Sequence, residues 1–313
     1  MAYITFQPHD YFNTVLWSGN GSAGRDITGV GFQPDWVWVK NRSRSSNHTI
    51  VDVLRGSGSY PMSSTNNGVQ DTSDTNQVSA LISDGFTVGS STNTNASSEN
   101  LVGWSWRAGG SGSSNTDGSI NTTATSVNTT AGFSICKWTG TGANATIGHG
   151  LGAVPKMYIV KNVDTTNDWN VYHHNIGNTH RLFLNTTAAK EDNASAWNDT
   201  SPTSSVFSVG TNTNVNQNGD TMIAYVFAEK SGFSKFGKYV GNGNADGQFI
   251  YTGFKPAWLM LKQTGTQGWF LVDNKRANPF NPIDGSLHPN SNAAEDTSSD
   301  FFVDFLANGF KLR

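Results

Sequence analysis

The stretch of sequence that decides the fold reads Gly31-Phe32-Gln33-Pro34-Asp35-Trp36-Val37-Trp38-Val39-Lys40. It recurs twice, as Gly152-Ala153-Val154-Pro155-Lys156-Met157-Tyr158-Ile159-Val160-Lys161 and as Gly253-Phe254-Lys255-Pro256-Ala257-Trp258-Leu259-Met260-Leu261-Lys262. The proline lies at positions 34, 155 and 256, so the copies are displaced by 121 and then by 101 residues. Self-similarity of this kind is the signature of a repeat architecture, and three structural repeats are therefore expected.

Two further markers keep the same register. An aromatic residue and a Gly-x-Gly turn precede each copy, in Trp17–Gly21, Trp138–Gly142 and Tyr239–Gly243. A phenylalanine follows each copy, at Phe86, Phe207 and Phe310. We predict an N-terminal segment over 1–10, β-sandwich repeats over 11–107, 132–229 and 232–313, and a Gly/Ser/Thr/Asn linker over 108–131. The linker predicts a loose joint between the first two repeats and a tight one between the last two.

The third repeat ends early. Leu101–Trp106 matches Met222–Phe227 in the second repeat, and the comparable strand of the third repeat would begin near position 325, beyond Arg313. Two interpretations stay open. The sequence is part of a longer chain, which we favour, or a neighbouring molecule supplies the last strand by strand addition.

Short apolar alternation bounded by turn residues indicates β-strands. Trp36–Val39 is apolar on both faces, as expected of a central sandwich strand, and Phe133–Trp138 alternates. With roughly 100 residues a repeat and turn signals about every 8–12 residues, the chain is predicted to be all-β, with tandem antiparallel β-sandwich repeats of jelly-roll or lectin-like kind. Single helical turns are expected only within Gln77–Ile82 and Asp296–Leu306.

Composition excludes several classes of protein. Charged residues make up 14% of the chain, whereas soluble domains average about 25%. The 20 basic residues are scattered singly, which argues against nucleic acid as a partner. No apolar run approaches the roughly 18 residues of a transmembrane helix, and no secretory signal is visible, so no membrane insertion is expected. The single cysteine, Cys136, excludes a disulfide framework and a multi-cysteine zinc site.

No catalytic constellation emerges from the sequence. His149, His173, His174 and His180 are the densest imidazole cluster, and we interpret them as polar loop residues rather than as metal ligands. Asp52 and Arg55 recur as Asp273 and Arg276; a repeated ion pair or turn cap is favoured over a binding pair for a sugar or carboxylate. The Gly-x-Gly element precedes no helix start, so turns with positive φ are expected there rather than a phosphate cradle. We predict no enzyme activity, no catalytic residues, no metal site and no cofactor.

Three tryptophans in loop-like surroundings are candidate glycan-binding residues. Trp169, Trp197 and Trp269 lie among Asn, Asp and Thr residues, and an indole face can stack on a sugar ring while its neighbours bond the hydroxyls. The alternative is that these rings plug the ends of the sandwich, and at each single site it is slightly favoured.

The decisive motif resembles a repeat family of tailed-bacteriophage virion proteins of the tail-fibre type. Gly31–Arg42, Trp169–His173 and Tyr251–Trp258 carry the likeness, which covers nearly the whole chain from Phe6 onward. The resemblance implies a structural protein and offers no catalytic residues to carry over. In the proteins that it resembles, the last repeat usually continues through a strand like Ile223–Glu229.

We therefore expect a non-enzymatic virion protein, in a tail fibre or another surface appendage, with host-surface glycans as candidate ligands. The alternatives are a capsid-decorating or head-fibre protein without a receptor role and, less favoured, a polysaccharide-degrading tailspike. Other virion proteins and host cell-surface polysaccharide are the expected partners. A homo-oligomer, with a trimer as the first guess, is expected on the tail or capsid surface after assembly in the host cytoplasm.

Overall fold

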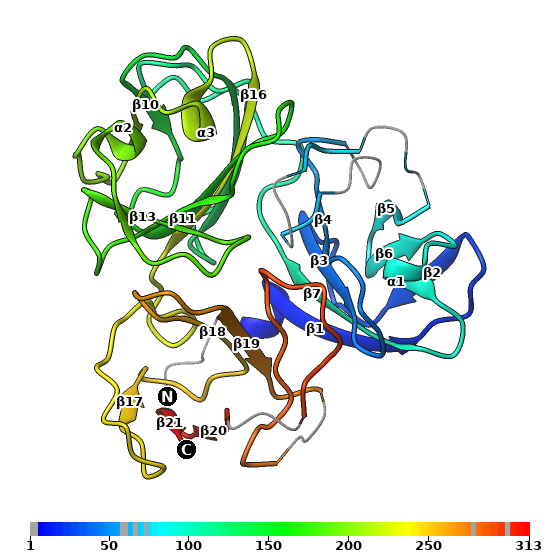
Figure 1. Cartoon of the computed structure of the whole chain (residues 1–313). Coiled ribbons are helices and arrows are strands. Elements are labelled where there is room, and N and C mark those ends of the chain that lie inside the picture. The colour runs from blue at the N-terminus through cyan, green and yellow to red at the C-terminus, as the bar shows by residue number, and fades with distance from the viewer. Residues whose placement is uncertain are drawn as a thin grey trace.

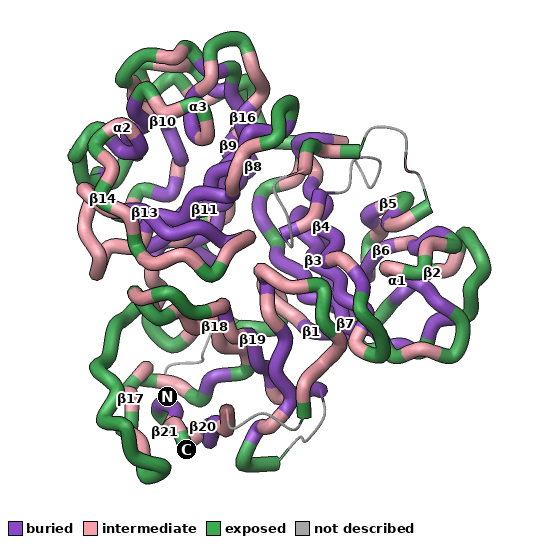
Figure 2. Tube along the Cα trace, viewed as in Figure 1, coloured by how far each residue is buried: buried purple, intermediate pink, exposed green. Residues whose placement is uncertain are grey.

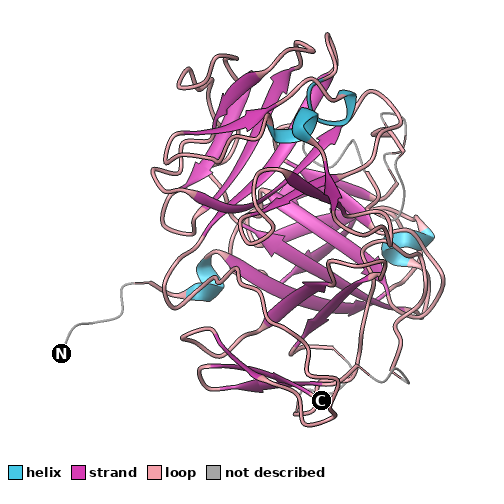
Figure 3. Ribbon diagram, turned by 60° about the vertical axis from the view of Figure 1, so that its left-hand side comes forward, coloured by secondary structure: helices cyan, strands magenta, loops and turns pink. Residues whose placement is uncertain are grey.

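The computed structural model describes residues 6–56, 62–64, 68–71, 74, 76–276, 280–297 and 301–313. Its sheets are antiparallel, its helices are single turns, and strands dominate the molecule (Figure 3). The predicted all-β fold is confirmed. Of the predicted N-terminal segment, residues 1–5 lie outside the described part, and Pro8–Asp10 form a short 3-10 turn, η1. No helix in the described part is long and apolar enough to cross a lipid bilayer.

The first repeat is a sandwich of two sheets. Its inner sheet has the strand order β1-β7-β3-β4, and its outer sheet has the order β2-β6-β5. The inner strands are β1 (Phe12–Ser18), β3 (Trp36–Asn41), β4 (Thr49–Asp52) and β7 (Asn100–Trp106). The outer strands are β2 (Arg25–Thr28), β5 (Val78–Ile82) and β6 (Gly85–Val88).

The second repeat keeps this plan and extends it. Its inner sheet has the order β14-β13-β12-β11-β16-β9-β8, and β10 pairs with β15 in the outer sheet. The inner strands are β8 (Ala124–Asn128), β9 (Phe133–Thr139), β11 (Pro155–Asn162), β12 (Asn170–His173), β13 (His180–Phe183), β14 (Glu191–Asp192) and β16 (Thr221–Ala228). The outer strands are β10 (Ala145–Gly148) and β15 (Val206–Val209).

The linker predicted over 108–131 is wrong. Strand β8 lies inside it and pairs with β9 along its whole length. The chain before β8 is also bonded to this repeat, because Gly109 N donates to Ser126 Oγ at 2.8 Å and Ser113 bridges Thr125. Small polar residues suggested flexibility, but here their backbone groups take part in a sheet.

Among its described residues, the third repeat has a two-stranded inner sheet. Its inner strands are β18 (Trp258–Lys262) and β19 (Trp269–Asp273). Its outer strands are β17 (Phe249–Tyr251), β20 (Val303–Leu306) and β21 (Gly309–Leu312), in the order β17-β21-β20. In the described residues, nothing pairs with the edge of β18 that faces away from β19.

The inner strands are apolar on both faces because each face meets a different core. In β3, Val37 and Val39 pack toward the outer sheet of the same repeat, whereas Trp36 and Trp38 enter a cluster shared by all three repeats. This central core also contains Tyr225 of the second repeat, along with residues of β18 and β19. Figure 1 shows the three repeats as three lobes, and in Figure 2 buried stretches run along the inner strands, where the lobes meet. The repeats are therefore parts of one packed body.

Three single helical turns lie in polar segments between strands. They are α1 (Thr92–Asn95), α2 (Ala194–Trp197) and α3 (Thr213–Asn216). The helical turn predicted within 77–82 is wrong, because that segment contributes β5. Of the segment 296–306, residues 298–300 lie outside the described part, and 303–306 form β20 rather than a helical turn. At equivalent places, the buried Asn95 and Asn216 each accept a hydrogen bond from the middle residue of the Gly-x-Gly element of their own repeat. The expected positive φ is found at the second glycine of each loop, for example 69° at Gly21.

Candidate functional site

Two of the candidate glycan-binding tryptophans lie at equivalent positions between repeats. The Trp169 side chain is fully buried, and its Nε1 donates to Ser63 O of the first repeat at 3.0 Å. Trp269 is 4% exposed, and its Nε1 donates to Phe183 O of the second repeat at 2.8 Å. Each indole thus satisfies a carbonyl of the neighbouring repeat.

His48 takes the same position in the first repeat. Its Nδ1 accepts a hydrogen bond from Trp38 Nε1 at 2.7 Å, so its Nε2 carries the proton and donates to His288 O of the third repeat at 3.1 Å. Burial lowers the pKa of His48 well below the usual value, which keeps the ring neutral. The three donors connect the first repeat to the third, the third to the second and the second to the first, which makes a closed ring.

Trp197 lies inside the second repeat. It is fully buried between the inner and outer sheets, and its Nε1 donates to His180 O at 3.0 Å. The assignment of Trp169, Trp197 and Trp269 to glycan binding is therefore corrected, because stacking on a sugar needs an exposed ring face. The alternative interpretation, in which the rings plug the ends of the sandwich, is right that they are buried, but Trp169 and Trp269 lie between repeats and Trp197 lies between the two sheets.

The repeated acid–base pairs form a second set of contacts between repeats. Asp52 Oδ2 accepts from Arg55 Nε at 2.5 Å and from Tyr225 Oη of the second repeat at 2.8 Å. Asp273 Oδ2 accepts from Arg276 Nε at 2.6 Å and from Trp104 Nε1 of the first repeat at 2.9 Å. The favoured interpretation, a repeated ion pair and turn cap, describes both sites.

The surroundings of these pairs fix the protonation states of their acidic groups. Burial by itself raises the pKa of Asp273, but the charge of Arg276 and the hydrogen bonds that Asp273 accepts outweigh burial, so the pKa lies below its ordinary value. Burial raises the pKa of Tyr225 well above the usual value, and the charge of Asp52 raises it further. Tyr225 therefore stays a hydrogen-bond donor, and Asp273 stays a carboxylate at neutral pH.

The imidazole cluster does not converge on a metal site. His149 Nε2 lies 3.2 Å from Thr203 O, and His174 Nε2 lies 3.0 Å from Phe236 O. Burial and the neighbouring His174 lower the pKa of His173 to about 4. Among the described residues, no group of three or more His, Cys, Asp or Glu side chains is placed to hold a metal ion.

Cys136 is a buried strand residue with an unreactive thiol. Its side chain faces the core between the two sheets of the second repeat. Burial raises the pKa of the thiol to about 12. Since the thiolate is the nucleophile, this cysteine does not serve a nucleophilic reaction at neutral pH.

Exposed aromatic side chains gather on the outer sheet of the third repeat. Phe249 and Tyr251 of β17 are 46% and 65% exposed. In the pairing of β17 with β21, Phe249 lies opposite Lys311 and Tyr251 lies opposite Gly309. In the first repeat β2 pairs with β6 in the same way, and the equivalent residues there are Asp26 and Thr28. We name Phe249 and Tyr251 the outer aromatic pair. The sequence analysis missed this pair, although alignment of the repeats shows aromatic residues where the other copies have small or polar ones.

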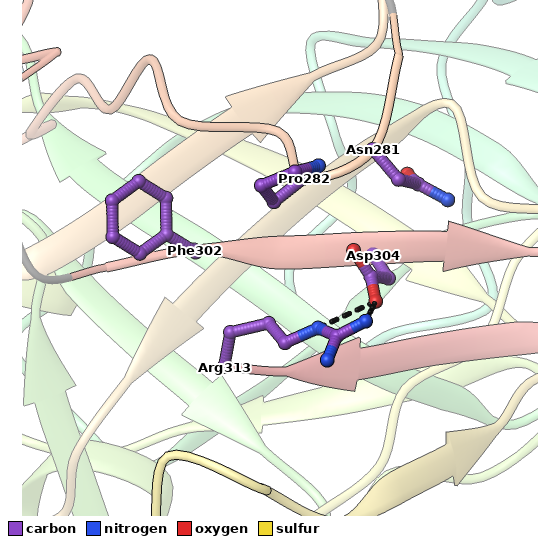
Figure 4. A pocket seen from close by; sticks show the side chains of 5 residues that line it. All are labelled: Asn281, Pro282, Phe302, Asp304 and Arg313. Carbon is purple, nitrogen blue, oxygen red and sulfur yellow. Dashed lines mark hydrogen bonds and ion pairs between the residues drawn. The ribbon is translucent and has the colours of Figure 1, made fainter.

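An open hollow of about 530 Å³ lies on the same repeat (Figure 4). Asp304 and Arg313 form an ion pair at its wall, with Arg313 Nε 2.7 Å from Asp304 Oδ2. Asn281 is bonded to the backbone of Phe305, at 2.8 and 3.0 Å. The carboxylate of Asp304 is thus paired with Arg313, and the amide of Asn281 is bonded to Phe305. Among the described residues that line the hollow, there is no serine, cysteine, histidine or lysine.

Comparisons with known proteins give one family. No curated protein and no solved structure matches the chain. The family described as a domain of unknown function (DUF7483) matches residues 7–313. Because this match spans nearly all of the sequence, the chain belongs to the DUF7483 family.

Proposed function

We propose that the chain is a non-enzymatic structural protein of a bacteriophage virion, in a tail fibre or another surface appendage. The proposal rests on the contacts that the repeated polar side chains make between repeats. Asp52, Asp273, Trp169 and Trp269, which the sequence offers as candidate binding residues, all bond a neighbouring repeat, so these side chains hold the body together. The repeat motifs that resemble virion proteins support the same proposal.

The outer aromatic pair is the proposed contact for host-surface glycans. Phe249 and Tyr251 are exposed aromatic side chains on one strand, and the Tyr251 hydroxyl can bond a sugar hydroxyl. Aromatic rings supply contact area at a low cost in side-chain entropy, which suits repeated weak contacts on a polysaccharide. This pair replaces the buried tryptophans in the glycan part of the proposal.

Electron microscopy of the virion tests the location. Virions produced from the genome that encodes the chain would be labelled with gold-conjugated antibody raised against the purified protein. We expect label on the tail appendages at a fixed number of copies. Label confined to the head would favour the capsid-decorating alternative, and unlabelled particles would contradict the proposal.

A glycan array tests the contact surface. The variant Phe249→Thr/Tyr251→Thr introduces residues that the other repeats carry at these positions, as at Thr146 and Thr28, and should remove binding to bacterial surface polysaccharide. Val154→Ala, at an exposed site of the second repeat, is the matched control and should bind as the wild type does. Binding retained by the double variant would refute this site. Shortening of the bound polysaccharide would refute the non-enzymatic part.

The proposed homo-oligomer has its own measurement. Virion appendages are symmetric assemblies, and a trimer is the proposed state. Light scattering coupled to size-exclusion chromatography at micromolar concentration should give three times the chain mass of 33.6 kDa. A single-chain mass at that concentration would contradict the oligomer.

A further inference from the structure

We propose that acid releases a strap by which the third repeat holds the first repeat, and that His48 takes up the proton. The strap is the segment of residues 288–295, which lies between the β-bridges at Leu287 and Asp296 and contains no strand of its own. Four of its residues bond the first repeat. These contacts join His48 Nε2 to His288 O at 3.1 Å, Ser64 Oγ to Pro289 O at 2.9 Å, Ser46 N to Asn292 O at 2.7 Å, and Arg42 Nη2 to Glu295 Oε2 at 2.6 Å.

The hydrogen bonds of His48 allow only the neutral ring. Its Nδ1 accepts from Trp38 Nε1 at 2.7 Å, and an indole nitrogen can only donate. Protonation would put a second N–H on the ring at Nδ1, directly against the N–H of Trp38. The imidazolium therefore cannot keep this position, and a ring that leaves it gives up the hydrogen bond to His288 O at the start of the strap.

The surroundings of His48 also oppose a positive charge on the ring. His48 is 1% exposed, and burial lowers its pKa well below the ordinary value. The hydrogen bond to His288 O favours the proton but does not outweigh burial. The carboxylates of Asp273 and Glu295 are directed at Arg276, each at 2.6 Å. The titratable groups that lower the pKa of His48 further are Lys40 of β3, His288 of the strap and Arg276, which follows β19.

Release of the strap changes the protonation equilibrium of the ring. In the open state His48 meets water and has the ordinary pKa of about 6.5, whereas the closed strap keeps the ring neutral. Because only the open state binds the proton, the ratio of open to closed chains rises about tenfold for each pH unit below 6.5. Lys40 and Asp273 stay charged between pH 6.5 and 4.5, because burial lowers the pKa of Lys40 only to about 8 and the pKa of Asp273 lies below its ordinary value.

Hydrogen–deuterium exchange at pH 7, 5.5 and 4.5 tests the proposal on the full chain. The reporters are the amides of Ser46 and Glu295, which donate across the strap contact to Asn292 O and Arg42 O at 2.7 and 2.9 Å. After correction for the intrinsic exchange rate, exchange at both amides should rise about tenfold from pH 5.5 to 4.5 and about 80-fold from pH 7 to 4.5. Peptides from β9 and β16, inside the second repeat, should exchange more slowly at every pH.

Two variants assign the effect to one ring. His48→Gln keeps a polar side chain that does not titrate, and exchange at Ser46 and Glu295 should then lose its dependence on pH. His173→Gln is the matched control, since burial lowers the pKa of this histidine to about 4 but it lies in the second repeat. It should leave the pH response of the strap as in the wild type.

Three results would overturn the proposal. The first is exchange at the strap amides that does not change between pH 7 and 4.5 in the wild type, an outcome that needs no variant to fold. The second is an unaltered pH response in His48→Gln. The third is exchange at the strap amides no faster than in β9 and β16, because the strap would then open only with the whole fold. None of these results depends on the location of the protein in a virion.

Discussion

At the residue scale, one repeated position connects the three repeats. His48, Trp169 and Trp269 each place a ring N–H against a carbonyl of the adjacent repeat. A buried carbonyl without a hydrogen-bond partner costs about 1–3 kcal/mol. Removing one of these donors therefore destabilises the fold by more than the net energy of the hydrogen bond that is lost. The same position tolerates an imidazole or an indole because both present an N–H at the end of a flat apolar ring.

Replacing Trp269 by phenylalanine tests this role. Trp269→Phe keeps an aromatic ring but leaves Phe183 O without its donor and removes buried volume. We expect a loss of about 2–4 kcal/mol in the free energy of unfolding, measured by urea denaturation. Tyr251→Phe, at an exposed site, is the control and should change stability by about 0.5 kcal/mol or less. Equal effects of the two substitutions would show that the Trp269 hydrogen bond is unimportant.

The buried carboxylate at Asp273 predicts a dependence of stability on pH. The pKa of Asp273 is lower in the folded chain than in the unfolded chain. The charged carboxylate therefore contributes fully to the free energy of unfolding above the unfolded pKa of about 3.9, and this contribution is lost as the pH falls through the folded pKa. Asp273→Asn leaves the buried Arg276 with Glu295, whose Oε1 lies 2.6 Å from Arg276 Nη1, as its remaining carboxylate partner, and should cost about 1.5–3 kcal/mol at pH 7.

Urea denaturation at pH 7, 5 and 3.5 measures this effect. The stability difference between wild type and Asp273→Asn should stay constant from pH 7 to 5 and shrink at pH 3.5. If the stability difference does not depend on pH, the negative charge of Asp273 does not stabilise the folded chain, and the prediction is wrong.

At the element scale, the inner strands follow directly from the sequence. The all-apolar pattern of Trp36–Val39 indicates a strand with two buried faces, and the structure adds what lies against each face. Propensity fails where tertiary pairing decides the conformation. The segment within Gln77–Ile82 suggested a helical turn, but Val78 and Leu81 pack under the outer sheet of the first repeat as part of β5.

Limited proteolysis tests the corrected linker. Since β8 pairs with β9 and residues 109–125 are bonded to the second repeat, the region over 108–131 should resist proteases under native conditions. Elastase is suited to this test because the region contains Ala124, Val127 and Ala131 but lacks lysine and arginine. Early cleavage there, with release of an intact first repeat, would contradict the assignment of β8.

At the scale of the whole molecule, repeat counting and packing give different information. The displacements of 121 and 101 residues define the three repeats, but sequence does not show that they share a core. The pattern of apolar residues along a strand indicates that a face of the strand is buried, but it does not indicate which element covers that face. For the same reason, Trp169 and Trp269 looked like loop residues on a surface, although they lie at the contacts between repeats.

The central claim is that the three repeats form one body around a shared core, and calorimetry tests it most directly. Residues of all three repeats meet in that core, so removing one repeat exposes apolar surface on the other two. Differential scanning calorimetry should therefore show one transition with equal calorimetric and van't Hoff enthalpies. Two or three separate transitions, each with the enthalpy of about 100 residues, would show that the repeats are independent domains and would contradict the claim.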